Sequence, residues 1–382
     1  MFLKPQNNGQ SNALLVSMPS VHFKRWVKSL PSHNYSFYWF DILSRGSIGS
    51  QSFESEIINW REQRLRGGDR VKTLFPNVFK ILERFFRVTQ AEAFAEIVKN
   101  LRPSIVHTFE FQNCTFPILE EIEKRDFRWI YSCWGSDIYW FGKIEEEREK
   151  LKRAMKRLDV LHTDCERDIR LAKELGFKGR IAAVIPGGGG YHLDLSNSIQ
   201  VNGNSRKLIL VKGYQHQFGR AIPVLKALNK CREDIADFTV AVFSPHPIVE
   251  KFIADEMSNL GIQIFKGLNH QEFLELMSKS KIYIGNSISD GIPNTLIESM
   301  LMGAFPIQSN PGGVTEELIV DGENGLLISD PENTDEIAKV IRRALSDNSM
   351  IMRAREANDQ IVRGKFSFES VKAQIQSLYN LS

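Results

Sequence analysis

The chain alternates short apolar runs rich in β-branched and aromatic residues with longer segments in which apolar residues recur at helical spacing. This alternation is typical of α/β layers built on parallel sheets. In the first half the apolar runs lie at residues 13–17, 35–40, 105–108, 129–132, 160–163 and 181–185. In the second half they lie at residues 208–211, 238–243, 262–265 and 282–284. We therefore expect one sheet in each half of the chain.

A stretch without apolar periodicity separates the two halves. It opens with Pro186 and four glycines and continues through polar residues to Arg206. A dinucleotide-binding loop has the pattern G-x-G-x-x-G and is followed by a helix. This run lacks the last glycine of that pattern and the helix, so we interpret it as a hinge. The predicted organisation is an N-terminal Rossmann-like domain (1–186), a linker (187–206), a C-terminal Rossmann-like domain (207–365) and a helix (366–382) that packs back on the first domain.

Composition narrows the function classes. The 382 residues carry 49 Lys+Arg and 46 Asp+Glu, and a net charge of +3 gives no argument for a nucleic-acid partner. The four cysteines are scattered, which predicts neither a disulfide framework nor a zinc site. The N-terminal apolar run is too short for a signal peptide, and no stretch approaches the roughly 20 apolar residues of a membrane span. We expect a cytoplasmic protein.

Residues 61–87 are locally basic. They hold eight Lys or Arg residues against three acids, interleaved with four phenylalanines. One interpretation is an ordinary amphipathic helix with a solvated face. The other is a surface that rests on anionic lipid on the inner face of the plasma membrane, each basic residue adding about 1 kcal/mol. The sequence leaves both open.

Residues 287–328 carry the strongest chemical signal. A strand is followed by a loop with Asp290, and then by a helix that begins near Pro293. Free amides at a helix N-terminus suit a phosphate, and carboxylates eight residues apart can bracket a polyhydroxylated ligand. The candidate residues of this segment are Asp290, Gly291, Ile292, Pro293, Asn294, Thr295, Leu296 and Glu298.

Four patterns in this segment, D-x7-E, SM-x2-G-x2-P, GG-x3-E and NG-LL, together resemble the GT-B glycosyltransferases of family 4. Asp290 stands where the family has the first glutamate. The resemblance implies an α/β fold with two Rossmann-like domains facing a central cleft, and a retaining transfer of sugar from a nucleoside diphosphate donor. It also implies that Glu298 holds the ribose hydroxyls of the nucleotide.

Residues 211–220 resemble the family's diphosphate loop more weakly. The positions that align with the family's arginine and lysine hold Tyr214 and Phe218. Lys212 and Arg220 flank the same loop, and we expect them to supply the two positive charges instead. Arg220 is the first candidate, because a guanidinium can hold phosphate bidentately. Gly213 and Gly267 are also assigned to the donor side.

Two segments of the first half resemble the family in outline. Residues 102–108 are similar to its P-D-V-V-H strand and residues 133–138 to its H-G-S-D loop. The resemblance places on the acceptor side His107, Gly135, Ser136 and Asp137. His107 is a candidate catalytic residue, although a satisfied polar group at a strand end is the equal alternative. His22 and His216 carry less signal.

These observations combine into one hypothesis with two alternatives. The hypothesis is a glycosyltransferase whose catalytic residues are Asp290, Glu298, Arg220 and His107, with a UDP-sugar donor and a saccharide or lipid-linked acceptor of surface polysaccharide synthesis. No metal or other cofactor is expected, because no D-x-D-like pair follows a strand. The alternatives are a nucleotide-sugar 2-epimerase of the same fold and a non-catalytic partner that binds sugar nucleotides.

Overall fold

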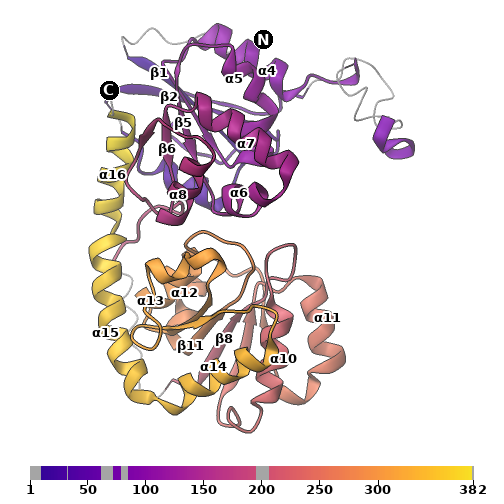
Figure 1. Ribbon diagram of the computed structural model, residues 1–382, viewed down its shortest axis with the longest axis vertical. Coiled ribbons are helices and arrows are strands. Elements are labelled where there is room, and N and C mark those ends of the chain that lie inside the picture. Colours follow the sequence, from indigo (N-terminus) through magenta and orange to yellow (C-terminus); the bar gives the residue numbers. More distant parts are fainter. Residues whose placement is uncertain (1–9, 32, 62–71, 79–84, 195–205, 381–382) are drawn as a thin grey trace. The chain divides into compact units, whose positions relative to one another are not determined.

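The computed structural model describes residues 10–31, 33–61, 72–78, 85–194 and 206–380, which form two compact units (Figure 1). The first unit comprises Met1–Asp164, Asp168–Gly189 and Lys372–Ser382, and the second comprises Cys165–Arg167 and Gly190–Val371. Each unit has its own parallel sheet with helices packed against it. The predicted fold class, α/β with two Rossmann-like sheets, is confirmed.

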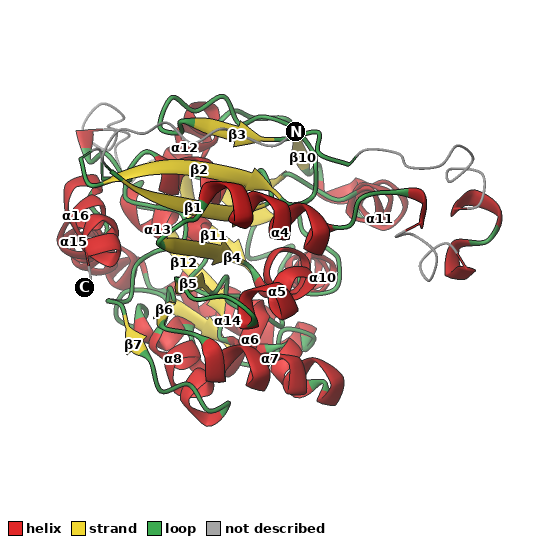
Figure 2. Cartoon of the chain, turned by 90° about the horizontal axis from the view of Figure 1, so that it is seen from above, coloured by secondary structure: helices red, strands yellow, loops and turns green. Residues whose placement is uncertain are grey.

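The first unit is built on a seven-stranded sheet with the order β3-β2-β1-β4-β5-β6-β7, in which all pairs are parallel (Figure 2). Its strands are β1 (Ser11–Ser17), β2 (Tyr35–Asp41), β3 (Ser55–Ile57), β4 (Ile105–Phe109), β5 (Arg128–Ser132), β6 (Val160–His162) and β7 (Arg180–Ile181). The helices of this part of the chain are α1 (Val21–Val27), α4 (Gln90–Leu101), α5 (Leu119–Glu123), α6 (Ser136–Tyr139), α7 (Glu145–Arg157) and α8 (Glu166–Glu174). A short π-helix, η1 (Phe111–Thr115), follows β4. The central strands are buried on both faces, which explains their continuous apolar runs.

The second unit is built on a six-stranded sheet with the order β10-β9-β8-β11-β12-β13, also parallel. Its strands are β8 (Leu208–Lys212), β9 (Thr239–Phe243), β10 (Gln263–Phe265), β11 (Ser280–Gly285), β12 (Phe305–Ser309) and β13 (Leu326–Ile328). Its main helices are α10 (Ala221–Lys230), α11 (Pro247–Glu256), α12 (His270–Lys279), α13 (Asn294–Leu301), α14 (Thr334–Ser346) and α15 (Asn348–Lys365). The last helix, α16 (Phe368–Asn380), begins in the second unit and ends in the first.

Three strands were not predicted, and one predicted strand is much shorter than expected. The missed strands are β3, β12 and β13, which are short or contain polar residues and proline. The run at residues 181–185 contributes only its first residue to β7. Ala182 and Ile185 still donate backbone hydrogen bonds to Leu161 and Thr163, at 2.9 and 3.1 Å, so the segment follows β6 irregularly toward Pro186.

The predicted linker contains a residue that belongs to the second core. Residues 195–205 lie outside the described part of the chain, but Tyr191 is buried and pairs with Phe366 and Phe368 through two backbone hydrogen bonds of 2.8 Å. Gly190 is required beside it, because a Cβ atom there would lie 2.6 Å from Cα of Phe368.

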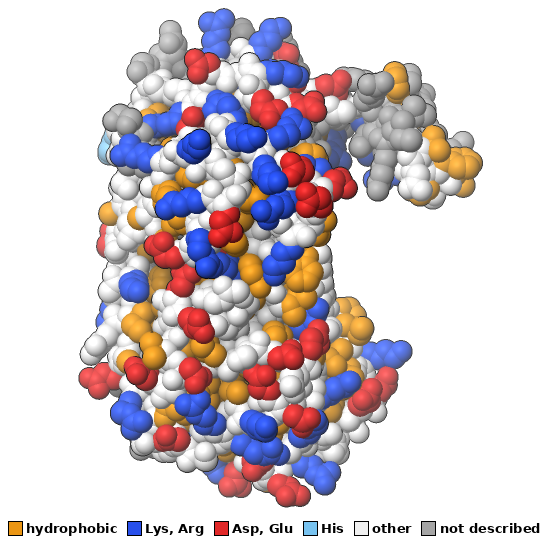
Figure 3. All heavy atoms as spheres, viewed as in Figure 1, with side chains coloured by type: hydrophobic (Ala, Val, Ile, Leu, Met, Phe, Trp, Pro, Cys, Tyr) orange, Lys and Arg blue, Asp and Glu red, His pale blue; other side chains and the backbone are white. Residues whose placement is uncertain are grey.

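On the face drawn in Figure 3, Lys and Arg side chains are interspersed with Asp and Glu, so neither sign of charge dominates that face. Most of the basic segment at residues 61–87 lies outside the described residues. Its described part exposes four large apolar side chains, those of Leu74, Phe75, Val78 and Phe85. In the described part of the chain, no helix has both the length and the apolar character needed to cross a bilayer.

A buried chain of hydrogen bonds ties α16 to the first sheet. The Tyr379 hydroxyl lies 2.8 Å from Nδ1 of His107, and Nε2 of His107 lies 2.7 Å from Oγ of Ser132. The same Ser132 oxygen lies 2.7 Å from Nδ1 of His162, whose Nε2 lies 2.9 Å from the carbonyl oxygen of Ile185. These groups are buried within the first unit.

The two ends of this chain fix the direction of every bond in it. At one end the carbonyl of Ile185 can only accept, so His162 donates from Nε2 and accepts at Nδ1. At the other end the Trp26 indole N–H, which can only donate, lies 3.2 Å from the Tyr379 oxygen. The hydroxyls of Tyr379 and Ser132 therefore donate to the two histidines, and both imidazoles are neutral. A proton added to either ring would break one of these bonds.

The first unit should lose stability on mild acidification. Burial lowers the pKa of His162 to about 4, and burial together with the neighbouring His162 lowers the pKa of His107. The unfolded chain therefore binds more protons, and the contribution is complete above about pH 6.5 and lost toward pH 4. Each histidine can cost up to about 1.4 kcal/mol per pH unit in this window.

Urea unfolding followed by tryptophan fluorescence measures this effect selectively, because all six tryptophans lie in the first unit. The urea midpoint should fall between pH 6.5 and 4.5. The variant H162Q, whose amide retains a donor for the Ile185 carbonyl, should show a smaller decrease, whereas H33Q at an exposed site should behave as the wild type. A midpoint that does not change with pH would contradict neutral buried histidines.

Candidate functional site

The loop between β11 and α13 places the two predicted carboxylates at the carboxyl edge of the second sheet. Asp290 is partly exposed, and its Oδ2 lies 3.9 Å from Nζ of Lys212 at the end of β8. Its Oδ1 accepts the backbone N–H of Gly291 at 3.0 Å. Because two adjacent strands end here, residues distant in the sequence are brought together as the pattern predicts.

The N-terminus of α13 follows directly. Pro293 precedes its first residue with φ −67° and provides no side-chain cap. The Thr295 hydroxyl is held 2.7 Å from the buried hydroxyl of Tyr283 on β11, which fixes the first turn against the sheet. The helix dipole and the first-turn amides make this end of α13 suited to an anion. Ile292 and Asn294 are half-buried beside it, and Leu296 is buried in the core.

Glu298 lies one turn inside α13 and is only 3% exposed. Its Oε1 lies 2.8 Å from Nε2 of His270, the first residue of α12. A capping box between Asn269 and Glu272 fixes the start of that helix and so the position of the imidazole. Sequence reasoning missed His270; its position three residues after Gly267, at the start of a helix, was the available signal. Gly267 itself has φ +64° in the turn before α12.

The loop at residues 213–220 joins β8 to α10 and is held against the end of β9. A Cβ atom on Gly213 would lie 2.5 Å from Cα of Pro245, so only glycine allows this approach. Nζ of Lys212 lies 4.8 Å from the ring centre of Tyr214, in cation–π geometry.

Arg220 has a different environment from the one expected. Its Nε is paired with the carboxylate of Glu332, and its Nη1 donates to the carbonyl oxygens of His216 and Gly219, both at 2.9 Å. The guanidinium therefore holds its own loop closed. Each bidentate face of a guanidinium uses Nη2 together with either Nε or Nη1, and both of these partners are already bonded within the protein in this arrangement.

The predicted acceptor residues of the first unit are mostly enclosed. His107 is fully buried and bonded at both ring nitrogens, so the prediction that it faces an acceptor is wrong. Asp137 is also buried, and its Oδ2 accepts from Tyr131 O–H at 2.6 Å and from the backbone N–H groups of Phe111 and Trp134, both at 3.1 Å. Burial and the neighbouring Glu110 raise the pKa of Asp137 to about 7.

The remaining two residues of that set flank Asp137 at the start of α6. Gly135 has φ +77° and is buried, whereas Ser136 is half-buried. Asp137 thus stabilises the loop after β5 through its buried hydrogen bonds. Of the predicted acceptor residues, Ser136 has a partly accessible side chain.

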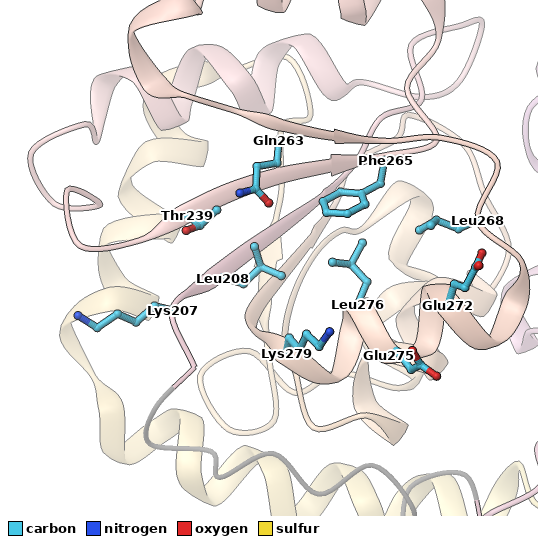
Figure 4. A pocket seen from close by; sticks show the side chains of 10 residues that line it. All are labelled: Lys207, Leu208, Thr239, Gln263, Phe265, Leu268, Glu272, Glu275, Leu276 and Lys279. Atoms are coloured by element: carbon cyan, nitrogen blue, oxygen red, sulfur yellow. The ribbon is translucent and has the colours of Figure 1, made fainter.

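A cavity of about 490 Å³ lies elsewhere in the second unit (Figure 4). Leu208, Thr239 and Gln263, at the amino ends of β8, β9 and β10, line it together with one side of α12. Ligands of open parallel sheets bind at the carboxyl ends of the strands. The lining also reaches Phe265 at the carboxyl end of β10 and Leu268 and Glu272 beyond it, but it includes neither Asp290 nor Glu298.

Comparison with known proteins finds similarity mainly in the second half of the chain. Residues 224–361 match the family model described as Glycosyl transferases group 1. Over 171 residues the chain is 25% identical to the MMP alpha-(1->4)-mannosyltransferase of Mycolicibacterium hassiacum. That alignment covers 44% of this chain and 40% of the relative, so the chain spans less than half the length of this curated protein.

Solved structures similar to this chain cover nearly all of it. Sucrose-phosphate synthase from Thermosynechococcus elongatus has a TM-score of 0.71 at 16% identity, over 97% of this chain and 98% of that one. HepE from Anabaena, in complex with UDP-glucose, has a TM-score of 0.67 at 12% identity, over 97% and 100%. At these identities the likeness establishes the fold. Residues 224–361 are thus similar to the group 1 glycosyl transferases, and the chain has the GT-B fold.

Proposed function

We propose that this chain is a retaining glycosyltransferase that moves a sugar from a nucleoside diphosphate donor to a hydroxyl group of its acceptor. The observation that carries the proposal is the pair of carboxylates, Asp290 and Glu298, on either side of the uncapped N-terminus of α13. The family match over residues 224–361 supports the activity, and the UDP-glucose complex of the similar HepE structure supports UDP as the carrier.

Each group at this edge of the sheet has a part in the proposed reaction. Glu298 accepts hydrogen bonds from the ribose hydroxyls, and Asp290 accepts them from hydroxyls of the donor sugar. As the bond between sugar and diphosphate breaks, negative charge grows on the leaving oxygen. The amides of the first turn of α13 and the ammonium of Lys212 stabilise that charge.

The acceptor hydroxyl attacks the oxocarbenium-like sugar from the face that the diphosphate leaves, and the departing phosphate takes its proton. We propose that these groups suffice without a metal ion. We also propose a saccharide or lipid-linked saccharide acceptor of surface polysaccharide synthesis. The exposed apolar side chains of Leu74, Phe75, Val78 and Phe85, in a basic segment, support contact with an anionic membrane on the cytoplasmic side.

Calorimetric titration with UDP, GDP and ADP, each with EDTA and again with magnesium, tests the donor and the metal independence together. We expect UDP to bind with equal affinity in both conditions. Magnesium-dependent binding would contradict the metal-free proposal, and preference for another nucleotide would replace UDP as the carrier. Incubation with UDP-glucose alone, followed by sugar analysis, distinguishes an epimerase. Binding without turnover over a broad acceptor panel would favour the non-catalytic alternative.

Replacing Glu298 with alanine should weaken UDP binding by roughly tenfold to a hundredfold, because charge-assisted hydrogen bonds contribute about 1.5–3 kcal/mol each. It should also abolish sugar transfer. The matched control is E256A, an exposed glutamate at the end of α11, which should bind UDP as the wild type does. An E298A variant with full affinity and turnover would refute the assignment of the donor site.

Membrane contact is tested by sedimentation with vesicles. Vesicles with phosphatidylserine should carry the wild-type protein down at low salt, and vesicles of phosphatidylcholine alone should carry down much less. Replacing both Leu74 and Phe75 with serine should reduce binding to the anionic vesicles. Equal sedimentation of the wild type and this variant would show that the exposed apolar residues do not contact lipid.

A further inference from the structure

Two histidines meet at the carboxyl ends of β8 and β9, beside the candidate donor site. His216 lies in the loop after β8, and His246 precedes α11 after β9. The backbone N–H of His246 donates to the carbonyl of Gly213 at 2.9 Å, which joins the two loops. The ring centres of His216 and His246 are 5.2 Å apart, and Tyr214 stacks on His246 at the same distance with an interplanar angle of 22°.

Hydrogen bonds with the backbone determine which nitrogen of each neutral ring carries the proton. Nδ1 of His246 lies 3.1 Å from the carbonyl oxygen of Gln215, which can only accept, so this nitrogen carries a proton. Nδ1 of His216 accepts the backbone N–H of Phe218 at 3.1 Å, so its proton is on Nε2. In the neutral pair, His216 therefore offers a donor at Nε2, whereas His246 offers a lone pair there.

The charged groups around these rings are already paired with carboxylates. Burial is the main cause that lowers the pKa of His216. His246, Lys212 and Arg220 lower it further, while Asp290 opposes them. Lys212 lies near Asp290, and Arg220 is paired with Glu332. The two positive charges of the site thus have acidic partners, whereas the two imidazoles contact backbone groups, aromatic rings and one another.

We propose that His216 and His246 bind the donor diphosphate at the positions left by the family's arginine and lysine, and that His246 takes up a proton from solvent when it does so. The proposal rests on the proposed function. A phosphate oxygen next to Nε2 of neutral His246 would face a lone pair, whereas the protonated ring donates a charge-assisted hydrogen bond. His216 donates from Nε2 without a change of charge, which preserves its bond with Phe218.

The expected consequence is a diphosphate affinity that rises as the pH falls. Titration of the wild type with UDP at pH 7.5, in two buffers with different ionisation enthalpies, should give a net proton uptake. H216A and H246Q should each weaken UDP binding about tenfold, since the first loses a phosphate hydrogen bond and the second loses the charge of one. H246Q alone should also lose the proton uptake, and because UDP is the same in every titration, its own protonation cancels in this difference.

H33Q serves as the control for the loss of an exposed histidine, and it should match the wild type in affinity and proton count. Thermal melting verifies that each variant folds. If H246Q does not fold, the proton uptake of the wild type and the UDP affinity of H216A still test the proposal. UDP binding that is unchanged in both variants, without proton uptake, would overturn the histidine site and leave the proposed transferase intact.

Inorganic pyrophosphate is a second probe that lacks the nucleoside. It should bind weakly to the wild type and still more weakly to both histidine variants. If UDP fails to bind the wild type but pyrophosphate binds with the same histidine dependence, the anion site stands and the proposed function fails. If neither probe binds, both proposals fall.

Discussion

The parallel direction of the strands is the constraint on which the second unit's site depends. Parallel strands all end at one edge of the sheet, and the helices that follow them begin there, with their positive ends toward that edge. Lys212 ends β8, His246 follows β9, Gly267 follows β10 and Asp290 follows β11. Residues far apart in the chain are therefore collected at one edge without any long-range motif.

The two cations at this edge are partly neutralised by nearby carboxylates, which limits their attraction for phosphate. Arg220 closes its own loop through Glu332 and two carbonyls, and Lys212 lies close to Asp290. On our proposal the imidazoles take the place of the family's arginine and lysine in contacting phosphate. Tyr214 occupies the position that aligns with the family's arginine. On this proposal it positions His246, because its ring stacks on the imidazole. The exchange makes phosphate binding depend on a proton, whereas a guanidinium is always charged.

The sequence predicted those features that depend on local pattern. Apolar runs located most central strands, and the D-x7-E segment located the α13 loop. Burial that depends on distant partners was not predictable: His107 is enclosed by Tyr379, 272 residues later in the chain. Asp137 was assigned to the acceptor side by resemblance, yet three donors from its own unit surround its carboxylate. The strand β12 was missed because Pro306 and two polar residues interrupt its apolar run.

Glu298 and His270 illustrate how a recognised residue depends on an unrecognised one. A carboxylate that is 97% buried pays a large desolvation cost unless a donor faces it. His270 provides that donor, and the capping box of α12 fixes the imidazole before any ligand arrives. Because the bond holds Oε1, the carboxylate group cannot rotate freely about its last torsion. Its orientation is therefore set in the free protein, and a nucleotide that binds there has less side-chain entropy to remove.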